Sequence, residues 1–210
     1  MHRLTLDAPT TALVVIDMQN DFCDPEGFYG RAGRDVASLA AVAAPIRAMA
    51  DRLRAAGGTV AFTRLVRDEV KGAMEERHSL RPKSWTTTGE RLILGTPGAE
   101  VIDALPVAAD DVVIDKTGYS AFHDTPLEAE LRARGIRTVM ICGVTTYACV
   151  LSSAFAAFDR DFDVVLLTDM VASWNARLCE DSGTIVDLLL GHAVPGDAID
   201  LRPAPSAAAS

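Results

Sequence analysis

Short apolar runs that alternate with helix-like segments limit the fold of this chain more than any other feature. The runs are Thr11–Asp17, Thr59–Arg64, Asp111–Lys116, Arg137–Cys142 and Phe162–Thr168. Most of their residues are apolar, with little alternation between apolar and polar side chains. Such strands are typical of a parallel sheet whose two faces are both covered by helices. We therefore expect an α/β fold, with its functional groups outside the carboxyl ends of the strands.

The segments between these runs carry helix signals. The expected helices span Asp35–Ala56, Ala99–Leu105, Ala148–Asp159 and Arg177–Leu190, with a further helix that Thr125 opens as N-cap and Gly135 ends. Pro45 would kink or break the first of these helices. A short last strand is expected near His192–Val194. Residues 65–98 contain repeated Gly and Pro and predict a loop, and loops of that length in compact domains are usually functional.

Length and composition are consistent with one globular domain. At 210 residues and 49% hydrophobic content, we expect a domain over residues 1–202 and a disordered Pro/Ala/Ser tail over 203–210. The formal net charge of −9 disfavours a nucleic-acid or an anionic-membrane partner. No apolar run approaches the roughly 18 residues of a membrane span, and no signal-peptide core is recognisable. The four cysteines form no C-x-x-C pair, which fits a cytoplasmic location.

Three reactive side chains follow or end the expected strands. Asp17 ends the first strand, Lys116 ends the third, and Cys149 lies in the first turn of the helix after the fourth. Backbone N–H groups at a helix start favour a thiolate, which is a nucleophile. Taken singly, these residues have simpler interpretations as a turn residue, a solvated strand end and a buried core thiol. Together, an acid, a cation and a thiol at one sheet edge are the parts of an activated nucleophile.

Three segments of the chain resemble the signature segments of the isochorismatase-like cysteine hydrolases. They read VVIDMQNDF, DKTGYSAFHDTPLEAELRARGI and MICGVTTYACV, and the resemblance covers about residues 10–172. It implies a catalytic triad of Asp17, Lys116 and Cys149, a cis peptide bond between Val144 and Thr145, and an oxyanion hole built from the N–H groups of Thr145 and Cys149. It also implies a Rossmann-like three-layer α/β/α sandwich with a mostly parallel six-stranded sheet, and a homo-oligomer, either a dimer or a tetramer.

The expected activity is hydrolysis of a non-peptide C–N bond in a small amide, lactam or ureide. Cys149 would form a thioester and release ammonia or an amine, without a cofactor. Two alternatives from the same fold remain: an isochorismatase-type enzyme and a catalytically silent binding protein. A dinucleotide-dependent oxidoreductase is disfavoured, because the first strand is followed by Asp17-Met18-Gln19-Asn20 and not by a G-x-G-x-x-G loop.

The remaining sequence predictions concern metals and the substrate pocket. A catalytic metal is not expected, because no histidine follows the second strand until His78. Aromatic residues beside the triad segments or in the long loop are candidates for the substrate wall, although aromatic side chains also pack in cores. These candidates are Phe22, Trp85, Tyr119, Phe122 and Tyr147.

Overall fold

The structure is a computed structural model that describes residues 3–70, 72, 78, 80 and 90–203. Trp85 and residues 204–210 of the expected tail lie outside the described residues. Among the described helices, none combines the length and the apolar character that crossing a membrane requires.

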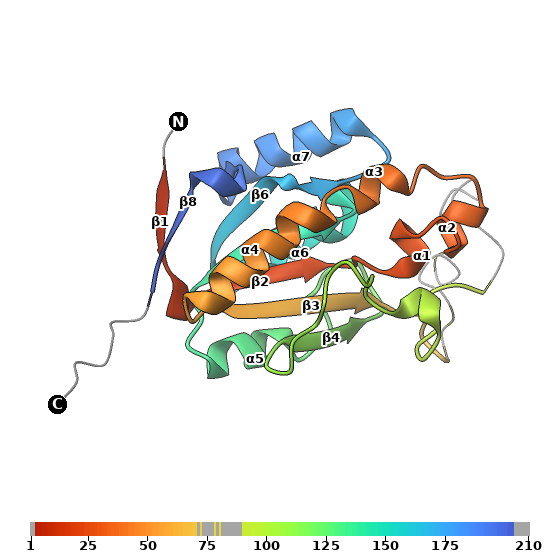
Figure 1. Cartoon of the computed structure of the whole chain (residues 1–210), viewed down its shortest axis with the longest axis horizontal. Coiled ribbons are helices and arrows are strands. Elements are labelled where there is room, and N and C mark those ends of the chain that lie inside the picture. Colours follow the sequence, from red (N-terminus) through yellow and green to blue (C-terminus); the bar gives the residue numbers. More distant parts are fainter. Residues whose placement is uncertain (1–2, 71, 73–77, 79, 81–89, 204–210) are drawn as a thin grey trace.

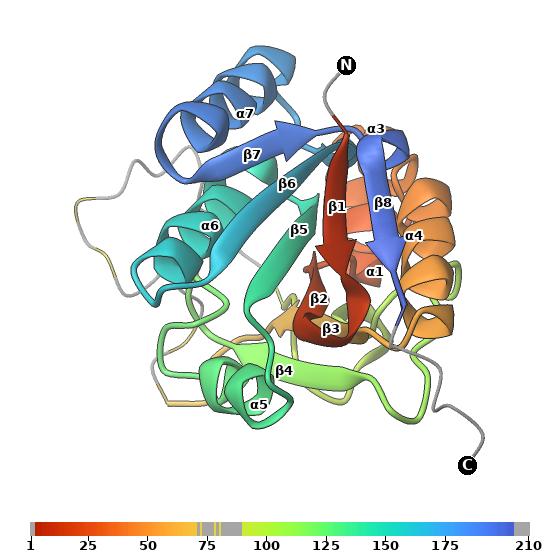
Figure 2. The same cartoon turned by 90° about the vertical axis from the view of Figure 1, so that its left-hand side faces the viewer.

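A six-stranded sheet forms the centre of the fold, and all of its strand pairs are parallel (Figure 2). In spatial order the strands are β4 (Val112–Lys116), β3 (Thr59–Leu65), β2 (Thr11–Ile16), β5 (Thr138–Val144), β6 (Asp163–Ala172) and β7 (Gly191–Val194). All six residues of β2 are buried, because β2 lies between two neighbours and is covered on both faces. The continuous apolar runs thus mark central parallel strands, as expected.

Helices cover both faces of the sheet, which gives three layers (Figures 1 and 2). On one face lie α3 (Ala37–Ala40) and α4 (Ala43–Ala55), which pack Leu39, Ile46 and Met49 against Leu13 and Val15. The other face is covered by α5 (Leu127–Ala133), α6 (Leu151–Phe158) and α7 (Ala176–Leu189). The short helices α1 (Asn20–Cys23) and α2 (Phe28–Arg31) lie beyond the carboxyl end of β2. The expected three-layer α/β/α architecture is confirmed.

The register of the sheet gathers the candidate residues at one edge. Ile16, the residue before Asp17, pairs with Thr63 of β3 and with Gly143 of β5. Leu65 of β3 pairs with Lys116 at the end of β4. Because all these strands are parallel, their carboxyl ends meet at the same edge.

Gly143 allows β5 to approach β2 closely. Its φ is +102°, and a Cβ at this position would lie 2.1 Å from the Ile16 carbonyl oxygen. A side chain would therefore clash with backbone in a conformation that L-residues rarely adopt. The pairing of β5 with β6 is irregular between Ile141 and Gly143, directly before the chain turns into the site.

Several expected elements differ in the structure. The helix over 35–56 is interrupted between Ala40 and Ala43, not at Pro45, which lies in the first turn of α4 where a missing N–H costs little. The expected helix over 99–105 is absent: Pro97–Ala99 form a 3-10 turn, and Val101 bridges Gln19. Thr125 accepts the Leu127 N–H at 3.4 Å, although α5 begins at Leu127, one residue later than expected.

A second, two-stranded parallel sheet was not expected. It joins β1 (Leu4–Asp7) near the start of the chain to β8 (Ile199–Arg202) near its end. Leu4, Leu6 and Ile199 contribute to the core on the α4 face. In Figure 2 this pair lies beside α4.

Candidate active site

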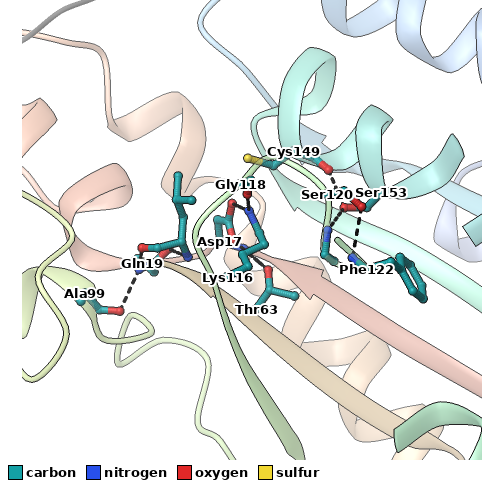
Figure 3. A network of polar contacts seen from close by, with 12 residues as sticks. Asp17, Gln19, Thr63, Ala99, Lys116, Gly118, Ser120, Phe122, Cys149 and Ser153 are labelled. Carbon is teal, nitrogen blue, oxygen red and sulfur yellow. Dashed lines mark hydrogen bonds and ion pairs between the residues drawn. The ribbon is translucent and has the colours of Figure 1, made fainter. Parts of the chain in front are cut away.

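A buried ion pair joins Asp17 and Lys116 across the sheet edge (Figure 3). The Nζ of Lys116 lies 2.7 Å from Oδ2 of Asp17, and neither side chain is exposed to solvent. The same Nζ donates a second hydrogen bond, of 3.0 Å, to the Gly118 carbonyl. Two charges without access to water stabilise one another only when they are paired and hydrogen-bonded. The sheet register and the two hydrogen bonds hold the carboxylate and the ammonium in contact.

The backbone at Asp17 adopts a left-handed conformation, with a φ of +50°. Such conformations are uncommon for residues other than glycine and persist where the surroundings over-determine them. Here Thr63 supplies the constraint: its Oγ1 donates to Asp17 Oδ1 at 2.7 Å, and its carbonyl oxygen accepts the Asp17 N–H at 3.2 Å. One carboxylate oxygen of Asp17 thus binds a hydroxyl and the other binds the ammonium.

Cys149 reaches this pair from the turn between β5 and α6. The turn is a single π-helical turn over Thr146–Val150, so the helical chain begins two residues earlier than expected, and Cys149 still lies in its first turn. The thiol is buried, with 4% of the residue exposed, and it lies close enough to Asp17 and Lys116 for both charges to affect its pKa. The expected acid, cation and thiol therefore meet in one buried cluster.

The electrostatics of the cluster differ from the expectation of a resting thiolate. Burial raises the pKa of the Cys149 thiol; Lys116 opposes this effect and Asp17 adds to it, so that the net pKa is above its usual value. Burial alone lowers the pKa of Lys116, but Asp17 and Cys149 outweigh burial, and the net pKa of the ammonium is raised. The resting cluster therefore holds a protonated Cys149 and a charged Lys116.

The start of the turn that carries Cys149 holds a backbone N–H donor without an acceptor. The Val144–Thr145 peptide bond is cis, as the resemblance implies. Thr145 is 8% exposed, and within the described part of the chain its backbone N–H has no hydrogen-bond acceptor. Its carbonyl accepts the N–H groups of Ala148 and Val150, which fixes the turn that carries Cys149. A buried N–H without an acceptor is available to a ligand oxygen.

Sequence reasoning assigned no role to three buried polar residues that hold the site together. Gln19 accepts the Leu65 N–H at 2.8 Å and donates to the Leu65 and Ala99 carbonyls, which ties β2 to β3 and to the loop before β4 (Figure 3). Asp21 accepts the N–H groups of Phe28 and Leu92.

The third residue, Ser153 of α6, connects two parts of the candidate site (Figure 3). Its hydroxyl donates to the Cys149 carbonyl at 2.6 Å and accepts the Ala121 N–H at 2.9 Å, so it joins the nucleophile turn to the segment after Lys116. Ser153 belongs to no periodic pattern and to no motif, so the sequence alone does not mark it as important. Only its burial in the folded chain distinguishes Ser153 from a surface serine.

The aromatic candidates separate into two groups. Phe22 stacks on Tyr29 with ring centroids 5.1 Å apart and lies 6.4 Å from Trp174, a residue that sequence reasoning did not select. Tyr119 is 38% exposed, and Tyr147 is half-buried two residues before Cys149. These residues lie at the edge of the site.

Phe122 is a buried residue, and Trp85 is not described. The Phe122 ring is 4% exposed and packs 5.8 Å from Phe162, which makes it a core residue on the α5 and α6 face. Cys149 is equally buried in the same cluster, so the assignment of Phe122 to the substrate wall stays a prediction. Trp85 lies outside the described residues.

A cavity of about 450 Å³ lies between the segment over 20–31 and the segment over 90–103. Asp21, Asp24, Arg31 and Arg91 are among its lining residues, whereas the three triad residues are not. Within the residues that the structure describes, no three His, Cys, Asp or Glu side chains are grouped in a way that could hold a metal ion. The absence of a catalytic metal remains a prediction from the sequence.

Comparison with known proteins gives consistent results. The isochorismatase domain matches residues 11–184. Ureidoacrylate amidohydrolase RutB from Methylobacterium radiotolerans is 33% identical over 176 residues, which cover 79% of this chain and 68% of the relative.

Two solved structures have a similar fold and are more than 25% identical in sequence. A cysteine hydrolase from Pseudomonas syringae pv. phaseolicola 1448A has a TM-score of 0.78 and 28% identity, and the match covers 93% of this chain and 92% of the other. An N-carbamoylsarcosine amidase from Thermoplasma acidophilum has a TM-score of 0.70 and 27% identity, with 89% and 95% covered. Since the domain match extends over most of the sequence and includes all three triad positions, this chain belongs to the isochorismatase family.

Proposed function

We propose that this protein is a cysteine-dependent hydrolase that cleaves the C–N bond of a small amide or ureide through a thioester on Cys149. The observation that carries the proposal is the burial of the Cys149 thiol beside the buried Asp17–Lys116 pair, whose two charges both act on it. An inert core thiol needs neither charge beside it, and burying the two charges is costly. The matched proteins add support, since they include a ureidoacrylate amidohydrolase and an N-carbamoylsarcosine amidase.

The first step is a proton transfer inside the cluster. When the substrate carbonyl arrives, Asp17 accepts the proton of the Cys149 thiol, and the sulfur forms a bond to the carbonyl carbon. Lys116 keeps its proton and compensates first the carboxylate and then the developing thiolate. The N–H groups of Thr145 and Cys149 bind the resulting oxyanion. One such donor contributes about 3 kcal/mol to the transition state in other enzymes.

The second half of the reaction reverses the direction of the proton. Asp17 gives its proton to the departing nitrogen, the C–N bond breaks, and ammonia or an amine leaves a thioester on Cys149. Asp17 then takes a proton from water, whose oxygen attacks the thioester carbonyl. The C–S bond breaks, the thiolate recovers the proton from Asp17, and the acid product departs. The sum is hydrolysis without a redox step or a cofactor.

The arrangement of these residues disfavours two of the alternatives that the sequence left open. A catalytically silent binding protein would not require all three triad side chains in contact. A dinucleotide-binding loop after β2 is incompatible with Gln19, whose side chain makes three hydrogen bonds to backbone where the glycines would lie.

The test is a screen for ammonia or amine release from primary amides, ureides and lactams, followed by variants of Cys149. Cys149→Ala should lose all turnover, while its circular dichroism and unfolding midpoint stay close to those of the wild type. Cys142→Ala is the matched control, because Cys142 is a buried thiol of β5 outside the triad. Intact-mass spectrometry of quenched reactions should show an acyl adduct on the wild type and none on Cys149→Ala. Full turnover by Cys149→Ala would refute the proposal.

A further inference from the structure

Phe22, Tyr29 and Trp174 pack together and form an aromatic wall. An arginine without an acidic partner lies at its rim. Arg34 belongs to the exposed segment between α2 and α3, where its N–H donates to the Tyr29 carbonyl. Within the described part of the chain, its side chain makes no hydrogen bond and no ion pair. By contrast, Arg54 and Arg64 each bind carboxylates with N···O distances of 2.6 Å.

Two contacts place the Arg34 guanidinium near the nucleophile turn. Its central carbon lies 5.6 Å from the centroid of the Trp174 ring. Its charge is close enough to Tyr147 to lower the pKa of that phenol, against the larger effect of burial, which raises it. Tyr147 is two residues from Cys149, and Trp174 follows β6, the strand beside β5. The guanidinium therefore lies at the same sheet edge as the triad.

The balance of charges makes this arrangement unusual. The chain carries 29 acidic side chains against 20 basic ones, so most cations can find an acidic partner. A guanidinium that contacts an aromatic ring through its face keeps its in-plane N–H donors for a planar anion. The wall holds another unused donor: Nε1 of Trp174 is buried, and no described residue accepts its hydrogen. The Arg34 guanidinium and Trp174 Nε1 are thus two donors without a described acceptor, which favours an anionic ligand.

We propose that Arg34 is a specificity residue that binds a carboxylate at the far end of the substrate, and that the protein therefore prefers amido or ureido acids to neutral amides and ureas. The inference rests on the proposed hydrolysis and assigns it a substrate class. Arg34 takes no part in bond cleavage: it binds the carboxylate through two parallel N–H···O hydrogen bonds and so positions the carbonyl at Cys149.

The test compares pairs of substrates that differ only in the charged group. Ureido acids with one, two or three methylene groups are paired with N-alkylureas of the same chain length. The wild type should cleave at least one acid with a kcat/KM at least tenfold above that of its neutral partner. Arg34→Ala should lower kcat/KM for that acid about tenfold, mainly through KM, and change the value for the neutral urea less than twofold. Arg34→Lys should recover part of the loss.

Arg177→Ala is the control variant, because Arg177 is an exposed arginine of α7 whose only described partner is Asp181. It should leave both substrates unaffected. Equal kcat/KM values of the wild type for acids and neutral ureas would overturn the inference and leave the hydrolase proposal intact. An equal loss on both substrates in Arg34→Ala would also overturn it, since a purely structural role predicts that result.

A binding experiment separates this inference from the hydrolase proposal. In a Cys149→Ser, Trp85→Phe background, Trp174 is the one remaining tryptophan, and its fluorescence reports on ligands beside Arg34. The ureido acids should change this fluorescence with an affinity at least tenfold above that of the alkylureas, and Arg34→Ala should remove the difference. Selective binding without turnover in the parent enzyme would contradict the hydrolase and support anion recognition. Equal affinity for acids and ureas, or no binding of either, would overturn the role of Arg34.

Discussion

Replacing Lys116 by methionine tests the buried ion pair at the centre of the site. Methionine keeps the length and much of the volume of the side chain but removes the ammonium that lies 2.7 Å from Asp17. The carboxylate then stays in a position with no solvent exposure and keeps only neutral groups around it, among them the Thr63 hydroxyl and the Cys149 thiol. Breaking a buried pair by removing one partner costs about 3–5 kcal/mol.

The size of the effect can be measured by urea unfolding at a fixed protein concentration. With a slope of about 2 kcal/mol per M urea, a loss of about 4 kcal/mol lowers the midpoint by about 2 M. The second half of the test is the Asp17→Asn, Lys116→Met double variant, which buries no charge. Asparagine tolerates the left-handed backbone at position 17 and still accepts the Thr63 hydroxyl. The double variant should therefore recover at least half of the stability that Lys116→Met loses.

The pH dependence of the stability of Lys116→Met provides an independent test. Without Lys116, the carboxylate at position 17 is a buried charge without a counter-charge, and protonation removes that cost. We therefore expect the destabilisation to be largest at neutral pH and to shrink as the pH falls into the acidic range. A loss below about 1 kcal/mol at pH 7, or a double variant as unstable as the sum of the two single variants, would refute the buried pair as described.

Three further predictions follow from single contacts. Iodoacetamide should label Cys149 slowly at pH 7, because burial and Asp17 raise the pKa of its thiol. Asp17→Asn should speed labelling roughly tenfold when labelled peptides are quantified by mass spectrometry. Equal labelling rates in the two proteins would contradict the effect of the carboxylate. Thr63→Val should cost about 1–3 kcal/mol in urea unfolding and lower kcat, while Thr63→Ser, which keeps the hydroxyl, should retain both. Gly143→Ala should lower the free energy of unfolding by more than about 2 kcal/mol, because the new Cβ would lie 2.1 Å from a backbone oxygen. Gly183→Ala in α7, where no atom lies within 4 Å of the new Cβ, should raise it by about 0.5–1 kcal/mol. Similar effects of the two substitutions would refute the close approach of β5 to β2.

The central strands could be predicted because their burial leaves a direct trace in the sequence. β2 and β5 are buried on both faces, so almost every residue in them is apolar, and the run itself marks the strand. The parallel order then fixed where the polar residues at the ends of the strands would meet. The proximity of Asp17, Lys116 and Cys149 could be predicted for this reason, whereas their catalytic roles stay a prediction.

The errors occurred where the local sequence does not determine the structure. The strands β1 and β8 have four residues each and lie near opposite ends of the chain, so neither has a sufficiently long pattern. The run over 99–105 resembles a helix. However, Gln19 donates a hydrogen bond to the Ala99 carbonyl and forms a β-bridge with Val101, which holds this segment in a loop. Trp174 and Arg34 were missed because each lies in a connecting segment, and only the folded chain brings them together.

In the proposed mechanism, the three side chains together avoid the net buried charge that a thiolate alone would create. A buried Cys149 with a raised pKa is a poor nucleophile, and a thiolate formed by losing a proton to water would leave a net charge in the core. Transfer of the proton to Asp17 avoids this, because Asp17, Lys116 and Cys149 carry one negative and one positive charge both before and after the transfer. The negative charge moves from the carboxylate to the sulfur while Lys116 stays in contact with both groups. In the proposed mechanism, burial thus disfavours the thiolate in the resting protein without preventing its formation against a bound carbonyl, which protects the thiol from solvent chemistry between turnovers.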